Sequence, residues 1–480
     1  MLKTKENKII FLIVTIISFL IYIFFLTGYY SVDTEKITNL GYDGYAINYS
    51  FYDGRIIMGI ICMIANTLNI NLKIFYIILL SISILISSIT VLKIYDIISK
   101  YKKTGIKQKI ILVIISFCYI FNFMTINNME FIECIAMSLS ILLYILTAEN
   151  IIIKKNPKKA FIYAFIAGIT YQGTINILFI TTILFALLEN NKQEKTENKK
   201  IIYSIICVII AIILNIVIKQ IMEIIIESTM QSQRLNANIF WNIGKMFKEM
   251  PLLIIDSLYL FPKYAYIIFN IGSLIIIYIY CIKNKSIKTW YNTLFLFVAS
   301  IVSSLILLII FDGLQSNNGR IFGSVGASFS IIWIYVYIKT DIFDNKGVIE
   351  KISIILITTF FILNCYNILE NTKIFKTANE LDQELAKNIA NKVEEYETQT
   401  NKKIKYIEIK YSESFKEKVK NYNTRAFLKS RVLTGNFSHD ILKAYTNIDL
   451  EKRFFEEEHL EKVKDEPIVC EDDTVYVLIK

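Results

Sequence analysis

The chain has 480 residues, of which 54% are hydrophobic, and carries a formal net charge of +10. Together with a mean hydropathy of +0.48, repeated apolar runs of about 18 or more residues predict an α-helical polytopic membrane protein. The only histidines are His439 and His459, and the seven cysteines show no metal-ligand or disulfide spacing, which excludes imidazole chemistry in the first 370 residues and a disulfide framework.

The first apolar run follows a head that bears lysines and has no small-residue cleavage site, so it predicts a retained helix. Lysines cluster in the segments Lys3–Lys8, Lys100–Lys109, Lys154–Lys159, Lys192–Lys200 and Lys283–Lys288. Short positive loops are typically cytoplasmic. With all of these segments inside, single spans are predicted at Ile9–Thr27, Ile74–Leu92, Ile110–Met124, Phe131–Leu146, Ile201–Ile218, Tyr264–Ile282, Trp290–Phe311, Ile321–Ile338 and Ile352–Leu369.

Two apolar segments need a different arrangement to keep this lysine pattern. Ile56–Leu68 is predicted to lie on the outer surface as an interfacial helix, because a further crossing there would reverse the orientation of the next basic loop. Ala160–Leu188 has lysines on both sides and a polar break at Thr170–Gly173. Two short helices that meet at this break give eleven spans in total, with the N-terminus cytoplasmic and the C-terminus extracytoplasmic.

A second domain is predicted after Leu369, and we divide the chain into residues 1–370 and 371–480. The second part holds 20 Lys+Arg and 21 Asp+Glu, so the basic excess belongs to the membrane part and gives no support for a nucleic-acid partner. Its length suits one small extracytoplasmic α/β domain. The predicted elements are a helix at Ala378–Tyr396, a strand at Ile404–Lys410, helices near Ala426–Val432 and Asp440–Tyr445, and a strand at Thr474–Ile479.

The arginines of the membrane part are few and all fall on the predicted outer side. They are Arg55, Arg234 and Arg320. A guanidinium is a planar fork suited to phosphate or carboxylate, and Arg320 directly precedes the Ile321 span, at headgroup depth. The pattern favours an anionic, phosphorylated substrate at the outer face; ordinary contact with lipid headgroups is the alternative interpretation.

Carboxylates on the predicted outer side are also few. The loop after the first span contains Asp33, Asp43 and Asp53, and the next outer turn contains Glu130 and Glu133. An acid at this position could accept a proton from a sugar hydroxyl at the membrane surface. The alternatives are a solvated loop for the aspartates and, for the glutamates, side chains that extend to the interface.

An acidic first outer loop that ends in Gly54-Arg55 before an interfacial helix resembles the Gtr-type glucosyltransferases that decorate bacterial surface polysaccharides. These belong to the GT-C class of multi-span glycosyltransferases. Asp33 matches the family's loop aspartate and Gly54-Arg55 its Gly-Arg pair. The turn Asn128–Glu133 is similar to its second outer motif, and Tyr171-Gln172 is similar to its Tyr-Gln in a broken span. The resemblance covers roughly the whole membrane part, in order and in topology.

The resemblance implies an inverting membrane transferase that moves a hexose, glucose in the family named, from an undecaprenyl- or polyprenyl-phosphate sugar to a cell-surface glycan or glycolipid. Asp33 would be the catalytic base, and Arg320, with Arg55, would stabilise the departing phosphate. No cofactor is certain, because Asp43, Asp53, Glu130 and Glu133 could bind Mg²⁺ or Mn²⁺ or could orient sugar hydroxyls. The implied substrate-binding residues are Arg55, Asp43, Asp53, Glu130, Glu133, Tyr171, Gln172, Arg234 and Arg320.

Two other functions stay open. A flippase or transporter for lipid-linked sugars would use outer arginines too, although it would typically carry charges in its span centres and an internal repeat, neither of which the sequence shows. A polysaccharide polymerase or ligase would have many spans and usually a long late outer loop; the longest such loop here is about Glu227–Lys263.

Overall fold

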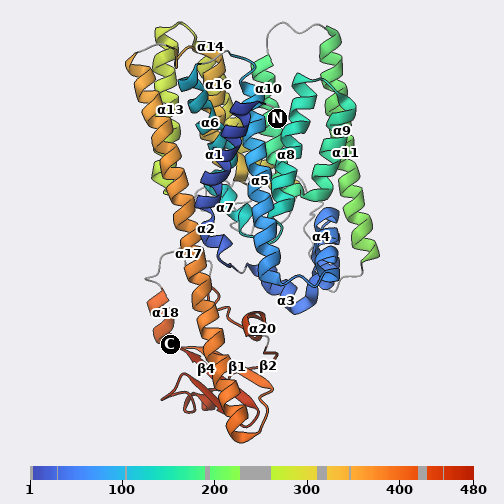
Figure 1. Ribbon diagram of the computed structural model, residues 1–480, viewed down its shortest axis with the longest axis vertical. Helices are drawn as coiled ribbons and strands as arrows, with labels where there is room; N and C mark the ends of the chain where they lie inside the picture. Colours follow the sequence, from blue (N-terminus) through green and yellow to red (C-terminus); the bar gives the residue numbers. More distant parts are fainter. Residues whose placement is uncertain are drawn as a thin grey trace.

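The computed structural model describes residues 4–29, 31–102, 105–189, 195–226, 261–310, 322–344, 347–419, 430–446 and 448–480. Within these ranges a few side chains are not described, among them that of Asp33. The described residues up to about 370 form a helical bundle, and the described C-terminal residues form a small domain at one end of it (Figure 1).

The bundle is built from long apolar helices interrupted by short ones. The long helices are α1 (Lys5–Ile21), α5 (Leu72–Ile98), α6 (Ile106–Ile120), α8 (Cys134–Ala148), α9 (Pro157–Thr170), α10 (Ile175–Glu189), α11 (Lys195–Ile225), α13 (Lys263–Lys283), α14 (Ile287–Ile310), α16 (Ser328–Lys339) and α17 (Val348–Thr400). The short ones are α2 (Ile23–Leu26), α3 (Val32–Tyr45), η1 (Ala46–Phe51), α4 (Ile56–Thr67), η2 (Phe123–Thr125), α7 (Ile126–Met129), η3 (Glu149–Ile153), η4 (Gln172–Thr174) and α15 (Gly323–Gly326).

Within the described residues, six helices are long and apolar enough to cross a membrane, or seven if α6 and the bent segment Phe123–Met129 count as one span. The isoleucines of α11 are largely exposed on the bundle surface, whereas α8 lies mostly inside it. A surface this apolar has to face lipid or a partner. The length and apolar character of these helices agree with the predicted helical membrane protein, and the count of eleven spans stays a prediction.

The lysine-rich segments gather at one end of the bundle, which we call the lysine-rich end. Lys109 Nζ lies 2.7 Å from Glu6 Oε2, and Lys107 Nζ lies 2.6 Å from Glu350 Oε1. Lys102 likewise pairs with Asp341 at 3.1 Å. These contacts place the N-terminal head, the Lys100–Lys109 loop and the segment that holds Asp341 and Glu350 side by side. The C-terminal domain lies at the other end, the tail-side end (Figure 1).

The helical path is interrupted at two places near the tail-side end. The second interruption, between α9 and α10, was predicted from the sequence. Between α6 and α8 the chain passes through η2 and α7, and every residue from 121 to 134 is buried. Between α9 and α10 the chain leaves the helix at Tyr171 and passes through η4, so the polar break expected at Thr170–Gly173 is confirmed. Irregular backbone at this depth is tolerated because neighbouring helices supply its hydrogen-bond partners.

The first loop folds into helix rather than open coil. Ser31 and Thr34 cap the start of α3 reciprocally, and the helix is kinked at Gly41. After η1, Arg55 directly precedes α4, whose 12 residues span only about 18 Å, less than the ~30 Å hydrocarbon core. Figure 1 shows α3 and α4 at the tail-side end of the bundle, where an interfacial helix was expected.

One helix joins the two parts of the molecule. α17 has 53 residues, about 80 Å in length, and runs without interruption from the bundle into the C-terminal domain (Figure 1). The predicted domain boundary near Leu369 therefore falls inside this helix. Because no flexible linker intervenes, the domain takes its position from the helix itself.

The C-terminal domain packs a four-stranded sheet on the end of α17. The strands β1 (Tyr406–Tyr411), β2 (Glu451–Arg453), β3 (Ile468–Glu471) and β4 (Thr474–Ile479) run in the order β2-β1-β4-β3. β1 is parallel to β2 and β4, and β3 is antiparallel to β4. Val393 of α17 packs with Leu442 of α20 (His439–Thr446) and with Val475 of the sheet.

The predicted elements of this domain agree with the structure where residues are described. The last strand has the bounds expected, and the first strand and the helix near Asp440–Tyr445 are displaced by at most two residues. A further short helix, α18 (Glu413–Val419), follows β1. Most of the helix expected near Ala426–Val432 lies outside the described residues. β2 and β3 were not predicted, because β2 is a three-residue exposed strand with no alternating pattern and β3 is only four residues long.

Candidate functional site

The centre of the candidate site is an arginine held by two acids at the tail-side end. Arg55 Nη1 lies 2.6 Å from each carboxylate oxygen of Glu133, and Nη2 lies 3.1 Å from Asp53 Oδ2. The Glu133 side chain is fully buried and that of Asp53 nearly so. Burial lowers the pKa of the Arg55 guanidinium, but the two carboxylates outweigh this effect and raise it. Arg55 is therefore a largely buried cation whose guanidinium is already bound to protein carboxylates.

The turn that presents Arg55 depends on Gly54. Its φ of 72° lies in the left-handed region, and a Cβ there would lie 3.2 Å from Lys219 Cβ on α11. Gln172 Nε2 donates to the carbonyl oxygens of Asp53 and Gly54, each at 3.4 Å. The Gly-Arg pair is therefore fixed by glycine's backbone freedom and by the broken span.

Three segments named from the sequence meet at this arginine. The Tyr171 ring lies beneath the Arg55 guanidinium, with its centroid 4.9 Å from Cζ. Glu133 is 78 residues away from Arg55 in sequence, and Tyr45 in α3 donates to Glu133 Oε1 at 3.4 Å. The structure thus brings Asp53, Arg55, Glu133, Tyr171 and Gln172 together.

Glu130 occupies a second buried position in the turn between the broken helices. Its side chain accepts a hydrogen bond from Tyr29 Oη at 3.1 Å, and the residue is only 3% exposed. Tyr76 Oη donates to the neighbouring Met129 carbonyl at 2.9 Å. Neither glutamate extends to the membrane interface. Tyr29 was not singled out from the sequence, where a tyrosine beside the first span indicates only an interfacial anchor.

A small pocket with a mixed lining lies where the broken segments approach each other. Its polar side chains are Asn122, Thr125 and Asn128 from one break and Thr174 and Asn176 from the other. Ile120, Ile141 and Ile177 supply apolar surface, and Gly323 lies at its edge. Asn128 Oδ1 is buried and has no hydrogen-bond partner among the described residues. The pocket is neutral, so it suits a hydroxyl or a water better than a phosphate.

The remaining acid of the set lies apart from these residues. Asp43 is exposed, and its Oδ2 accepts a hydrogen bond from Asn66 Nδ2 of α4 at 2.6 Å. Within the described part of the chain, Asp43, Asp53, Glu130 and Glu133 do not gather as a metal-ligand group; the one such group is Glu456, Glu458 and His459 in the C-terminal domain. Binding of Mg²⁺ or Mn²⁺ by the outer acids stays a prediction.

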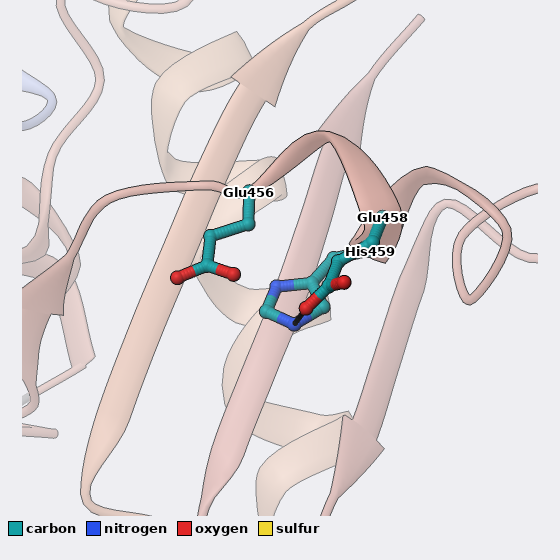
Figure 2. Close-up of side chains that lie close together, drawn as sticks. All are labelled: Glu456, Glu458 and His459. Carbon is teal, nitrogen blue, oxygen red and sulfur yellow. Dashed lines mark ion pairs between the residues drawn. The ribbon is translucent and has the colours of Figure 1, made fainter.

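Figure 2 shows the group in the C-terminal domain, where Glu458 faces the lower nitrogen of the His459 ring. Nε2 of that ring is 3.9 Å from Glu458 Oε1, and Nδ1 is 2.7 Å from Glu408 Oε2 on β1. Both Glu456 and Glu458 are exposed. The buried contact with Glu408 attaches the segment after β2 to the sheet, which explains the histidine's position by packing alone.

Three predicted residues cannot be placed. Arg234 and Arg320 lie outside the described residues. For Asp33 only the backbone is described: it forms part of the first turn of α3, close in sequence to Tyr29 on one side and to Glu35 on the other.

Sequence reasoning did not find a contact between the C-terminal domain and the first loop. Arg431 Nη2 lies 3.1 Å from Glu35 Oε2, across 396 residues. No local pattern distinguishes Arg431 from the other basic residues of the domain, so only the tertiary structure could reveal this contact.

No protein-family model, curated protein or solved structure matches this chain. The resemblance to Gtr-type glucosyltransferases therefore stays a prediction from the sequence motifs.

Proposed function

We propose that the chain is a membrane glycosyltransferase that moves a hexose from a polyprenyl-phosphate sugar to a surface glycan or glycolipid at the outer face. One observation carries the proposal: the acids at the tail-side end are buried in a fixed network around Arg55, Tyr45 and Tyr29. Buried carboxylates are costly unless they are paired or functional. A hydroxyl acceptor needs a base, and the membrane can hold the polyprenyl chain.

In the proposed reaction, Asp33 takes the proton of the acceptor hydroxyl. The acceptor oxygen forms a bond to the anomeric carbon from one side, while the bond from that carbon to the phosphate oxygen breaks on the other. The electron pair leaves with the polyprenyl phosphate, and the anomeric configuration inverts. The neutral pocket beside Asn128 suits a sugar hydroxyl, whereas the phosphate needs a cation.

The arginines divide between two roles in this proposal. Arg55 is bound to Glu133 and Asp53, so we assign it to holding the acids in place. Its own binding of phosphate would require one of those contacts to open. Arg320, immediately before a predicted span, is then the first candidate to neutralise the departing phosphate, and Arg234 is the second.

The test uses the purified full chain in lipid nanodiscs with radiolabelled undecaprenyl-phosphate glucose or galactose. Envelope glycans from cells that lack the protein serve as the acceptor. We expect label to enter the glycan and one undecaprenyl phosphate to be released per transfer. Asp33→Asn should abolish transfer, because the amide cannot accept the proton. The matched control Asp341→Asn, an exposed acid at the lysine-rich end, should not.

Other results would contradict the proposal and identify the alternatives. Movement of intact donor across a sealed bilayer, without cleavage, would indicate a flippase. Growth of a pyrophosphate-linked glycan without use of the monophosphate donor would indicate a polymerase. Near-normal transfer by Asp33→Asn would remove Asp33 as the base, and Glu35, Asp43 or Glu130 would be the next candidates.

A further inference from the structure

The C-terminal domain holds a loop in a fixed position by one buried carboxylate of α17. Asp382 is 1% exposed and accepts three hydrogen bonds from that loop. Oδ1 accepts from Ser430 Oγ at 2.6 Å and from the Val432 backbone N–H at 2.9 Å, and Oδ2 accepts from the Arg431 backbone N–H at 2.8 Å. The loop backbone on both sides of Arg431 is therefore tied to the helix that enters the membrane.

The loop directs Arg431 toward the bundle. Its Nη2 lies 3.1 Å from Glu35 Oε2, with side-chain exposures of 27% and 11%. Burial lowers the pKa of Arg431, and Glu35 and Asp382 more than offset this, so the pKa is raised and the charge is secure. α20 packs against α3 beside this pair, and its Tyr445 Oη accepts a hydrogen bond from Asn379 Nδ2 of α17 at 2.5 Å.

The first turn of α3 is thereby held from two directions. On the bundle side, Tyr29, just before the turn, donates to Glu130. On the domain side, Glu35, within the turn, binds Arg431. Asp33 lies in this turn between Tyr29 and Glu35, so its backbone position depends on both contacts.

We propose that Arg431 is a positioning residue, which holds the first turn of α3 at the outer-face site from the C-terminal domain. The C-terminal domain then contributes Arg431 to the structure of that site. This inference rests on the proposed function, since it assigns to the turn the task of presenting the base Asp33. Two observations support it. α17 runs unbroken from the bundle into the domain, and Asp382 on this helix fixes the backbone that carries Arg431 by three hydrogen bonds.

The experiment compares Arg431→Ala, Arg431→Lys and the exchanged pair Glu35→Arg with Arg431→Glu in the full chain. Hydrogen exchange across residues 31–45 reports the position of the turn without any substrate. Transfer kinetics with undecaprenyl-phosphate sugars report its consequence. Arg453→Ala is the matched control, because this half-exposed arginine of the same domain contacts Asp473 at 3.8 Å and the Tyr406 ring, both within the C-terminal domain.

We expect Arg431→Ala to speed exchange in the first turn of α3 and to lower kcat by about 100-fold, the scale of a small misplacement of a catalytic group. KM for the donor should change little, because the donor phosphate is held elsewhere. Arg431→Lys and the exchanged pair should restore part of both losses, and Arg453→Ala should cause neither.

Unchanged exchange in the 31–45 segment of Arg431→Ala would overturn the inference, whatever the activity. Faster exchange with normal kcat would overturn the positioning role. If the wild-type chain transfers no sugar while Arg431→Ala still loosens the turn, the proposed function fails but the attachment of the turn by Arg431 stands.

Discussion

Arg55 and Glu133 form a buried ion pair in which one guanidinium nitrogen lies 2.6 Å from both carboxylate oxygens. The pair joins the turn before α4 to the start of α8. Since both segments are irregular at this point, the ion pair stabilises a junction that backbone hydrogen bonds cannot stabilise alone.

Glu133→Gln should therefore lower the free energy of unfolding strongly. The substitution leaves Arg55 buried with one acidic partner, Asp53, and breaking a buried pair typically costs about 3–5 kcal/mol. Equilibrium unfolding in mixed micelles measures the loss. Glu6→Gln is the control, since its half-exposed pair with Lys109 should be worth about 1 kcal/mol or less. Equal losses for the two variants would show that the Arg55–Glu133 contact adds no stability.

Gly54→Ala should also destabilise the protein. The backbone φ of 72° disfavours an L side chain, and the new methyl group would lie 3.2 Å from Lys219 Cβ. We expect a cost of about 1–3 kcal/mol, measured by the same unfolding experiment. Gly435→Ala provides a comparison, because its φ is 73° but no atom lies within 4 Å. The loss of unfolding free energy at Gly435 measures the backbone strain alone. Any additional loss at Gly54 measures the contact with Lys219.

Asp382 should make stability fall as pH rises from its ordinary pKa of about 3.8. Burial raises the pKa of this carboxyl, although Ser430, the loop N–H groups and Arg431 act in the opposite direction. A raised pKa means that the folded chain binds more protons than the unfolded chain across the window between the two values, so unfolding becomes easier as the proton leaves. Tyr411 and Tyr445 also face this carboxyl and stay neutral there, since burial raises their pKa values, that of Tyr411 to about 12.

The measurement is thermal unfolding of the full chain from pH 4 to pH 7, compared with Asp382→Asn. The amide does not titrate, so its melting temperature should not follow the titration of this group. As the pH rises across this window, the melting temperature of the wild type should therefore fall more than that of Asp382→Asn. Parallel curves would mean that the hydrogen bonds of Asp382 cancel the effect of its burial.

The orientation is testable by cysteine labelling of intact cells. Asn71→Cys and Ser414→Cys should react with an impermeant reagent from outside, because the lysine pattern puts both residues there and both are exposed. Lys158→Cys, exposed at the lysine-rich end, should be protected. Ser50 would not serve, since it is fully buried. Protection of Asn71→Cys together with labelling of Lys158→Cys would reverse the topology and move the site to the cytoplasm.

Local sequence patterns were enough to predict the long apolar helices, the broken helix at Tyr171, the short length of α4 and the last strand. These properties follow from local patterns: the length of an apolar run, a polar interruption and alternation in a strand. Each depends on residues that are near one another in the chain, so each can be recognised without knowing what packs against it.

Which distant residues contact each other could be learned from the fold alone. From the sequence, Arg55 was predicted to bind phosphate because it lies on the outer side. The fold shows that its guanidinium is already paired with Glu133 and Asp53. Arg431 reaches Glu35 because α17 runs unbroken into the C-terminal domain and Asp382 fixes the loop. The partners of these two ion pairs are separated by 78 and by 396 positions in the chain. Such pairs leave no local pattern, since their energy depends on burial that the whole fold creates.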